Sequence, residues 1–410
     1  MRYSFFSAAT LRRILPLLLL IIGGAPLAAE LLPYGSMTPL EPKAEVDRWW
    51  PDSMRVVGVA HVGRHGARYL SSDKKVADVR RHLDAARRRG TLTPQGERAC
   101  AILDTVCRAT GPDWGMLTAL GFRQEHLIGH QMTALAPQLY RTGGAVAIAT
   151  TVPRVVQTMY ALCSTLARAS EKQSIVAADS PSFDPLLRFF ESDSAYVGYL
   201  HDGRWRATYD DFCRRTIPLR PATALVGETD ADAARDLTMA LYAVMQGMPA
   251  AALDISPDVW FTPAEMQACA AVSNLRHYLQ RCANPDGAEP ARAAVPLLRD
   301  ILRALENPAD SVSLRFGHAE TLLPLFSLMG LPGCDDPRLA PDDVARSFDV
   351  GAISPLGANL QLYVLAAPSG RRYVAALLNG VPVPPAPGAD AVMPLDEFHL
   401  AMHTRIDAIE

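Results

Sequence analysis

A short apolar run followed by a cationic cluster constrains the fold of this chain, and the place of its ligand site, more than any other sequence feature does. Residues 55–62 (RVVGVAHV) are rich in β-branched side chains and too few for a core helix, so they predict a buried strand. Residues 63–68 (GRHGAR) follow this strand directly. In open α/β sheets, ligands bind beyond the carboxyl ends of the strands. The position of the cluster therefore predicts a ligand site at one edge of a sheet.

The residue types in this cluster suit phosphoryl transfer. A neutral imidazole nitrogen of His65 can attack phosphorus in line, while the guanidinium groups of Arg64 and Arg68 hold and neutralise the phosphoryl oxygens. Gly66 would let the backbone turn close beneath an anion. The alternative interpretation is a basic surface loop with a solvated histidine.

The order of strand and helix patterns predicts an α/β fold with a mostly parallel sheet flanked by helices. Helices are expected at residues 76–89, 94–109 and 118–140, and from Pro153 to Ala169. Strands are expected at residues 55–62, 145–150, 311–316, 360–366 and 373–378.

The pattern changes between the second and third of these strands. Residues 170–307 show loops and helices without a convincing strand. The clearest helix there begins at Thr262, which can cap it, with Pro263 in the first turn and Glu265 completing a capping box. We therefore expect a helical cap domain at 170–307, inserted into an α/β catalytic core formed by residues 30–169 and 308–410.

The first 29 residues have the pattern of an export signal. Arg2, Arg12 and Arg13 accompany an apolar run at 14–22 and a small-residue stretch at 25–29. As a helix the apolar run spans only about 14 Å, against the roughly 30 Å of a bilayer interior. We therefore expect a signal peptide at 1–29, an exported protein in the periplasm or secreted, and no stable membrane anchor.

Composition excludes several classes of protein. A chain of 410 residues with 49% hydrophobic and 20% charged residues is neither disordered, collagenous nor a coiled coil. Its 40 basic and 43 acidic residues leave a net charge of −3, which provides no field to hold a nucleic acid. We expect a small phosphorylated molecule as partner and no nucleic acid, and the oligomeric state stays open.

Seven cysteines would enter an oxidising compartment after export, where disulfides are expected and at least one cysteine stays unpaired. Two pairs, Cys100 with Cys107 and Cys269 with Cys282, each fall in one predicted helix. Their separations of about 10 Å and 20 Å exceed the limit of about 7 Å for a bridge. The spacings fit no zinc pattern, so structural or buried thiols are favoured and the disulfide pairing stays open.

Two further strand ends carry candidate residues. His318 and Glu320 follow the third expected strand, and Glu320 is the candidate acid because a leaving alkoxide needs a proton. By itself His318 would also fit a structural histidine beside a glutamate at a helix start. Arg154 follows the second strand and would add a third guanidinium group, or it would be a surface residue at the start of a helix.

Together these motifs resemble the histidine phosphatase superfamily, in its acid phosphatase and phytase branch. The resemblance covers most of the chain that would remain after signal cleavage and rests on residues 64–68 (RHGAR), on Arg154 and on residues 318–320 (HAE). Residues 115–121 (GMLTALG) also resemble the Leu-Thr-x-x-Gly stretch of that branch. The fold and the activity of that branch are therefore what the resemblance leads us to expect.

The late motif narrows the resemblance. Most of the branch has His-Asp there, whereas His-Ala-Glu is similar to multiple inositol polyphosphate phosphatases, as are residues 186–191 (LLRFFE). There are two departures, Leu70 where proline is usual and Glu191 where aspartate is usual. Neither departure affects a residue to which the resemblance assigns a role in the reaction.

The resemblance also implies what each residue does. His65 would be the phosphorylated nucleophile and Glu320 the proton donor, in an exported enzyme that hydrolyses inositol polyphosphates such as phytate. No metal or other cofactor is implied. The alternatives are a broad acid phosphatase, or a non-catalytic protein that binds a phosphate ligand on the same fold. The implied phosphate pocket consists of Arg64, Arg68, Arg154 and His318.

Three minor candidates complete the sequence-based predictions. Lys74 and Lys75 could reach other phosphates of a substrate, or be solvated at the surface. His126 and His130 lie four apart on a predicted helix, but no third metal ligand is evident. His61 is expected to be a packed, hydrogen-bonded residue of the first strand.

Overall fold

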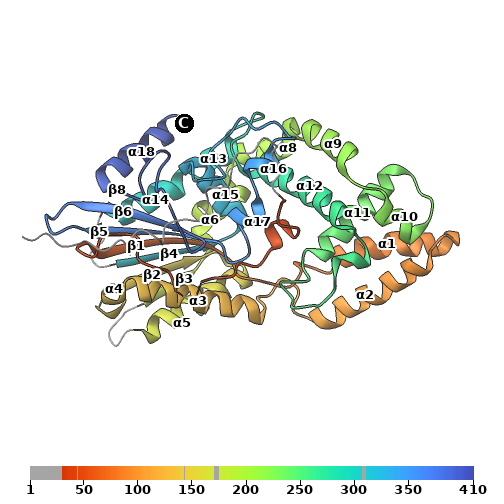
Figure 1. Ribbon diagram of the computed structural model, residues 1–410, viewed down its shortest axis with the longest axis horizontal. Helices are drawn as coiled ribbons and strands as arrows, with labels where there is room; N and C mark the ends of the chain where they lie inside the picture. Colours follow the sequence, from red (N-terminus) through yellow and green to blue (C-terminus); the bar gives the residue numbers. More distant parts are fainter. Residues whose placement is uncertain (1–29, 44, 143, 170–174, 307–310) are drawn as a thin grey trace, which may run out of the picture.

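A sheet with strand order β3-β2-β4-β1-β5-β6-β7, and with β8 beside β6, runs through one half of the molecule (Figure 1). The computed structural model describes residues 30–43, 45–142, 144–169, 175–306 and 311–410. The predicted signal peptide at 1–29 lies outside the described residues, as do residues 170 and 307 at the predicted domain boundaries. Within the described ranges, no helix has the length and apolar character needed to span a bilayer.

The strands divide into a parallel and an antiparallel half. The parallel strands are β1 (Arg55–Arg64), β2 (Gly144–Ala149), β3 (Ile175–Asp179) and β4 (Ser311–Gly317). The strands β5 (Asn359–Ala366), β6 (Arg372–Leu378), β7 (Val381–Val383) and β8 (Val392–Pro394) join by antiparallel pairing.

The predicted α/β class is confirmed, but the sheet is mixed where a mostly parallel one was expected. The connection from β5 to β6 shows the physical reason. Only residues 367–371 separate these strands, whereas a parallel crossover needs a dozen residues or more. The short connection forces an antiparallel hairpin.

Helices cover both faces of the sheet (Figure 1). One face packs against α3 (Ala119–Leu135), α4 (Pro137–Thr142) and α5 (Pro153–Arg168). The other packs against α14 (Val295–Glu306), α15 (Ala319–Met329) and α18 (Leu395–Asp407). Strand β5 alternates accordingly, with Leu362 in the second of these cores and Tyr363 in the first.

A helical lobe lies beside the sheet (Figure 1). We use this name for α1 (Lys74–Arg89), α2 (Pro94–Thr110), α9 (Arg204–Thr216), α10 (Arg220–Val226), α11 (Ala231–Met245) and α12 (Pro263–Arg281). Leu83 of α1, Leu103 of α2 and Leu241 of α11 belong to one buried apolar cluster. Two helices that precede β2 in the sequence therefore pack with helices that follow β3.

Short elements connect these layers. They are η1 (Gly35–Met37), η2 (Pro181–Phe183), α6 (Asp184–Leu187), α7 (Phe189–Ser192), α8 (Ser194–Asp202), η3 (Pro257–Val259), α13 (Glu289–Ala293), α16 (Val344–Ser347) and α17 (Val350–Ile353).

Most predicted elements lie within a few residues of their expected positions, and the capping box of Thr262 and Glu265 on α12 is present. One predicted helix is divided. Residues 118–140 form α3 and α4 because Pro137 disfavours a helical conformation at Ala136, whose φ is −137° and ψ 55°. The short strands β3, β7 and β8 were not predicted.

The seven cysteines are all free thiols in the described residues, so the expected disulfides are not shown there. Cys163, Cys269 and Cys334 are buried in three different apolar clusters. There they pack as small hydrophobic side chains, and Cys282 lies within side-chain hydrogen-bond reach of Cys334.

Candidate active site

The loop that follows β1 is held by hydrogen bonds at three successive peptides. Because each of these backbone N–H groups is buried and satisfied, the loop has little freedom to change shape. The bonds run from His65 N to Gly317 O (3.1 Å), from Gly66 N to Thr158 Oγ1 (3.1 Å) and from Ala67 N to Gln124 Oε1 (2.7 Å).

Gly66 is required by a close helix contact. A Cβ atom at this position would lie 3.0 Å from both the Cα and the carbonyl oxygen of Gly121 in α3. The sequence suggested that this glycine makes room for an anion. The structure shows that it lets α3 approach the loop from behind.

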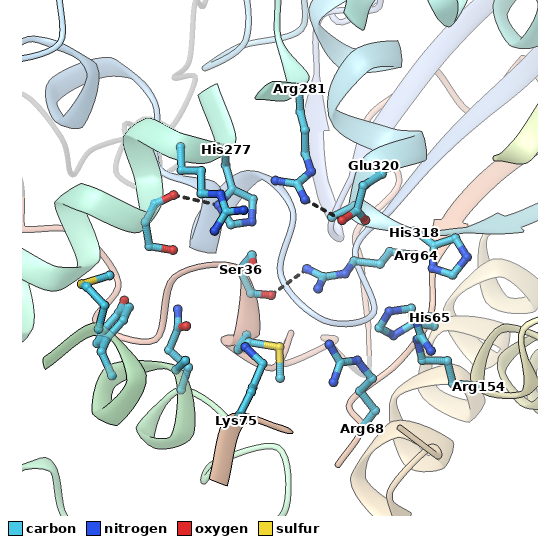
Figure 2. A pocket seen from close by; sticks show the side chains of 18 of the residues that line it. Ser36, Arg64, His65, Arg68, Lys75, Arg154, His277, Arg281, His318 and Glu320 are labelled. Carbon is cyan, nitrogen blue, oxygen red and sulfur yellow. Dashed lines mark hydrogen bonds and ion pairs between the residues drawn. The ribbon is translucent and has the colours of Figure 1, made fainter. Parts of the chain in front are cut away.

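All six predicted site residues line one cavity of about 390 Å³ between the sheet and the helical lobe (Figure 2). Strands β2, β4 and β1 are neighbours, so their carboxyl ends lie side by side. Arg64 ends β1, and the loop that follows carries His65 and Arg68. Arg154 is in the first turn of α5 after β2, and His318 and Glu320 follow β4.

His65 is a neutral imidazole with one free nitrogen. Its Nδ1 lies 3.0 Å from the carbonyl oxygen of Gly66, and since a carbonyl only accepts, Nδ1 carries the proton. Nε2 therefore keeps its lone pair. Burial, followed by the positive charges of Arg64 and Arg154, lowers the pKa of His65 well below that of an ordinary histidine. Its side chain suits nucleophilic attack even at acidic pH.

Four of the cations that line the cavity are arginines with a buried Nε group. The Nε groups of Arg64, Arg68, Arg154 and Arg281 are buried and have no hydrogen-bond partner among the described residues. Buried donors without partners are costly, so their gathering here indicates a site built for an anionic acceptor.

These guanidinium groups stay charged in spite of their crowding. Burial, opposed by the charge of Glu320, lowers the pKa of Arg64 to about 9. Burial and the charge of Arg154 lower the pKa of Arg68 to about 10. Both values lie far above the acidic range. Arg64 is also fixed in place, because its Nη1 donates to the carbonyl oxygens of Ser36 and Ser354 at 2.6 Å each.

His318 lies against His65 and is neutral too. The two ring centroids are 5.7 Å apart in an edge-on arrangement, and His318 Nε2 lies 3.3 Å from Thr150 Oγ1. Burial, which outweighs the opposing charge of Glu320, lowers the pKa of His318 to about 3. In the free protein, arginines rather than imidazoles therefore supply the positive charge of the phosphate pocket.

Glu320 is ion-paired at the mouth of this pocket. Its Oε1 accepts from Nη2 of Arg281 at 2.5 Å (Figure 2). Burial by itself would raise the pKa of Glu320, but the charges of Arg281 and Arg64 outweigh it and hold the pKa below the ordinary value. Glu320 is thus a carboxylate in the free protein.

The helical lobe completes the cavity with residues that, apart from Lys75, were not predicted from the sequence. Ser273, His277 and Arg281 recur every four residues along α12, so they share one face of that helix. This spacing was the only available signal, and it does not tell a cavity wall from a solvated face. The other lobe residues lining the cavity include Lys75, Tyr209, Tyr242, Gln246 and Arg276.

Of the minor candidates from the sequence, one lines the cavity and the others do not. Lys75 lines the cavity, whereas Lys74 does not. His126 Nδ1 lies 2.7 Å from Thr165 Oγ1, and no group of acidic, histidine or cysteine side chains within the described ranges is suited to a metal ion. His61 is buried beside Phe316, but neither of its ring nitrogens has a hydrogen-bond partner among the described residues, which differs from the expected bonded histidine.

Comparison with known proteins gives structural matches and no sequence matches. The sequence matches no protein-family model and no curated protein. The structure is similar to that of Bifidobacterium longum multiple inositol polyphosphate phosphatase in complex with inositol hexasulfate, with a TM-score of 0.72 and 17% identity over 90% of this chain and 97% of that one.

Two further solved structures agree. The phosphate complex of the same Bifidobacterium longum enzyme gives a TM-score of 0.73 with 18% identity, covering 91% of this chain and 98% of that one. The phytase from D. castellii gives 0.67 with 18% identity, covering 91% and 85% of the two chains. These similarities confirm the fold that the motif resemblance implied.

Proposed function

We propose that this chain is an exported phosphomonoesterase that removes phosphates from inositol polyphosphates through a phosphohistidine at His65. The observation that carries the proposal is the unprotonated Nε2 of His65 in a cavity with four buried, partly unpartnered guanidinium groups. Such an arrangement both attacks phosphorus and stabilises the charge that spreads over its oxygens.

In the first half-reaction, Nε2 of His65 forms a bond to phosphorus while the bond from phosphorus to the ester oxygen breaks. Arg64, Arg68 and Arg154 hold the transferring phosphoryl group. The departing oxygen takes a proton from Glu320, which leaves the alcohol product, a phosphohistidine and a carboxylate.

In the second half-reaction, that carboxylate accepts a proton from a water molecule as the water oxygen attacks phosphorus. The bond from phosphorus to Nε2 breaks, and inorganic phosphate leaves. His65 and a protonated Glu320 are regenerated, so one group acts first as acid and then as base.

The extent of the cavity favours a substrate with several phosphates. Beyond the arginines at the strand ends, Lys75 and Arg276 line the same cavity from the helical lobe. A substrate with one phosphate would leave these cations unused. The solved relatives, whose complexes contain inositol hexasulfate or phosphate, support the same class of ligand.

Phosphate release from phytate by the purified protein, with and without a metal chelator, tests the activity. Reactions with radiolabelled substrate, quenched in alkali because the phosphorus–nitrogen bond of phosphohistidine is acid-labile, should trap phosphate on the wild type. His65→Ala should trap none and lose activity on the order of 10³-fold or more. His201→Ala, which changes an exposed histidine of α8, is the matched control and should behave as wild type. Undiminished turnover in His65→Ala would remove the mechanism.

The same assay separates the two alternatives. A broad acid phosphatase would show a kcat/KM for p-nitrophenyl phosphate similar to that for phytate, whereas we expect phytate to be strongly preferred. A non-catalytic protein would bind phytate and release no phosphate. Export is tested by sequencing the N-terminus of protein recovered outside the cytoplasm, where cleavage after Ala29 is expected.

A further inference from the structure

One ion pair joins the helical lobe to the sheet across the cavity. Arg281 ends α12 of the lobe, and Glu320 lies in the first turn of α15, which packs on the sheet (Figure 2). Only 15% of the Arg281 side chain is exposed, and its Nε has no partner among the described residues. The guanidinium group therefore has a donor to spare while it binds Glu320.

Glu320 is the one carboxylate among the described residues that line the cavity. The titratable and charged groups whose fields act on it come from every surrounding element: the end of β1 and the loop after it, α5, α8, α12 and the residue after β4. They are Arg64, Arg68, Arg154, Tyr196, His277, Arg281 and His318. In the free protein the Glu320 carboxylate is thus the negative group that the surrounding cations bind in place of a substrate phosphate.

This position conflicts with what the proposed reaction asks of Glu320. A proton donor must be protonated before the ester bond breaks, yet the pair with Arg281 favours the carboxylate. A substrate phosphate presents the same kind of oxygen acceptor to Arg281 with more negative charge. Its arrival both competes for the guanidinium group and repels the carboxylate.

We propose that Arg281 is a positioning residue that keeps Glu320 ionised in the free enzyme. When a substrate phosphate binds, Arg281 pairs with that phosphate instead, so that Glu320 becomes protonated only in the substrate complex. The inference rests on the proposed function, since it concerns the same proton donor. It adds that substrate recognition by the lobe and protonation in the core are one linked event.

The proton balance follows directly. Binding takes one proton from solvent onto Glu320, and ester cleavage passes that proton to the leaving oxygen. Attack of water on the phosphohistidine returns a proton to Glu320. When phosphate leaves, Arg281 pairs with Glu320 again and the proton returns to solvent, so the cycle closes without a net change.

Calorimetric titration with inositol hexasulfate tests this linkage without turnover. Its sulfate groups stay ionised, so proton uptake measured in buffers of different ionisation enthalpy reports on the protein alone. Histidines of the cavity also take up protons, so the quantity of interest is the uptake in wild type minus that in Glu320→Gln. At pH 5 we expect this difference to be about one proton for each ligand bound.

The role of Arg281 is tested by repeating that subtraction in its variants from pH 3 to 6. In ligand-free Arg281→Gln, the Glu320 carboxyl should protonate at a higher pH than in the wild type. The onset of Glu320-dependent uptake, meaning the lowest pH at which it is observed, should therefore rise by about one to three pH units. Arg281→Lys keeps a cation and should restore most of the wild-type profile. Arg276→Gln removes an arginine of the same helix and cavity that does not pair with Glu320, and should leave the onset unchanged.

The outcomes separate this inference from the proposed function. Phosphate release from phytate without Glu320-dependent proton uptake would overturn the inference alone, as would equal onsets in Arg281→Gln and Arg276→Gln. Proton uptake without any phosphate release would overturn the proposed function and leave the linkage standing. Failure of inositol hexasulfate to bind would overturn both.

Discussion

The two ends of the cavity are built in different ways. At the sheet end, Arg64, His65 and His318 are only 3 to 5% exposed. The backbone that carries His65 and His318 is tied to neighbouring strands and helices by hydrogen bonds. At the lobe end, Lys75 and Arg276 extend from helix faces, and Arg276 is exposed to solvent.

This difference teaches how the work of the site is divided. Strand ends set positions to within a fraction of an ångström, which the attack of a nucleophile on phosphorus requires. Long side chains on helix faces tolerate movement and suit the gripping of phosphates that do not react. We therefore expect changes at the sheet end to lower the rate for every ester, and changes at the lobe end to alter which ester is preferred.

The largest expected effect comes from Glu320, where the two ends meet. Glu320→Gln removes the proton donor, so kcat for phytate should fall by about 10²- to 10⁴-fold. The rate for p-nitrophenyl phosphate should fall much less, because nitrophenolate leaves readily without a proton. Steady-state kinetics with both substrates measure the contrast. Equal losses would mean that Glu320 only shapes the pocket, and Glu191→Gln, at an exposed site, is the control.

The second prediction concerns pH and the sheet end. Because the pKa of His65 is lowered, the imidazole stays neutral on acidification and keeps its nucleophilic lone pair. An imidazole with an ordinary pKa of about 6.5 would lose about 50-fold of its neutral form between pH 6.5 and 4.5. We expect the rate of phosphoenzyme formation, measured by rapid quench with p-nitrophenyl phosphate, to stay nearly flat over this range. A tenfold fall for each pH unit would contradict the burial and charge assigned to His65.

The same division explains what the sequence could and could not predict. His65, Arg154 and Glu320 were placed in one site from three distant segments, because each lies within five residues of the end of a strand and the ends of neighbouring parallel strands meet. The position of a residue after a strand can be read from the local sequence. No comparable rule predicts that Arg281 reaches the cavity, because that depends on the angle at which α12 packs against the sheet.

The fold shows the same limit. The amphipathic pattern of α1 and α2 predicted two helices correctly, yet such a pattern is the same whether a helix covers a sheet or packs in a lobe. The antiparallel pairing of β5 with β6 follows from the length of their connection, which the sequence contains. Gly66 was singled out correctly, but its reason lies in Gly121, a contact across distant parts of the chain.

The third prediction concerns the lobe end. Lys75→Ala and Arg276→Ala should each raise KM for phytate by about tenfold, the cost of one charge-assisted contact, with little change in kcat. KM for p-nitrophenyl phosphate should change less than about twofold, since that ester does not reach these cations. Lys74→Ala is the control, because Lys74 is adjacent in sequence but does not line the cavity. An equal rise for both substrates would place Lys75 and Arg276 at the reacting phosphate.

The smallest expected effect concerns the hydrogen bond that fixes the loop after β1, and it must be distinguished from a general loss of stability. Thr158→Val removes the hydroxyl that accepts from Gly66 N at 3.1 Å, and leaving this buried donor unpaired should cost about 1 to 3 kcal/mol of unfolding free energy. Because Gly66 follows His65, kcat should also fall a few-fold. Thr165→Val removes a buried hydroxyl of the same helix that pairs with His126, so it should lower stability comparably and leave kcat unchanged. Urea unfolding and turnover should be measured on both variants. If both lose activity in proportion to their loss of stability, the site depends on the stability of α5 as a whole rather than on this one hydrogen bond.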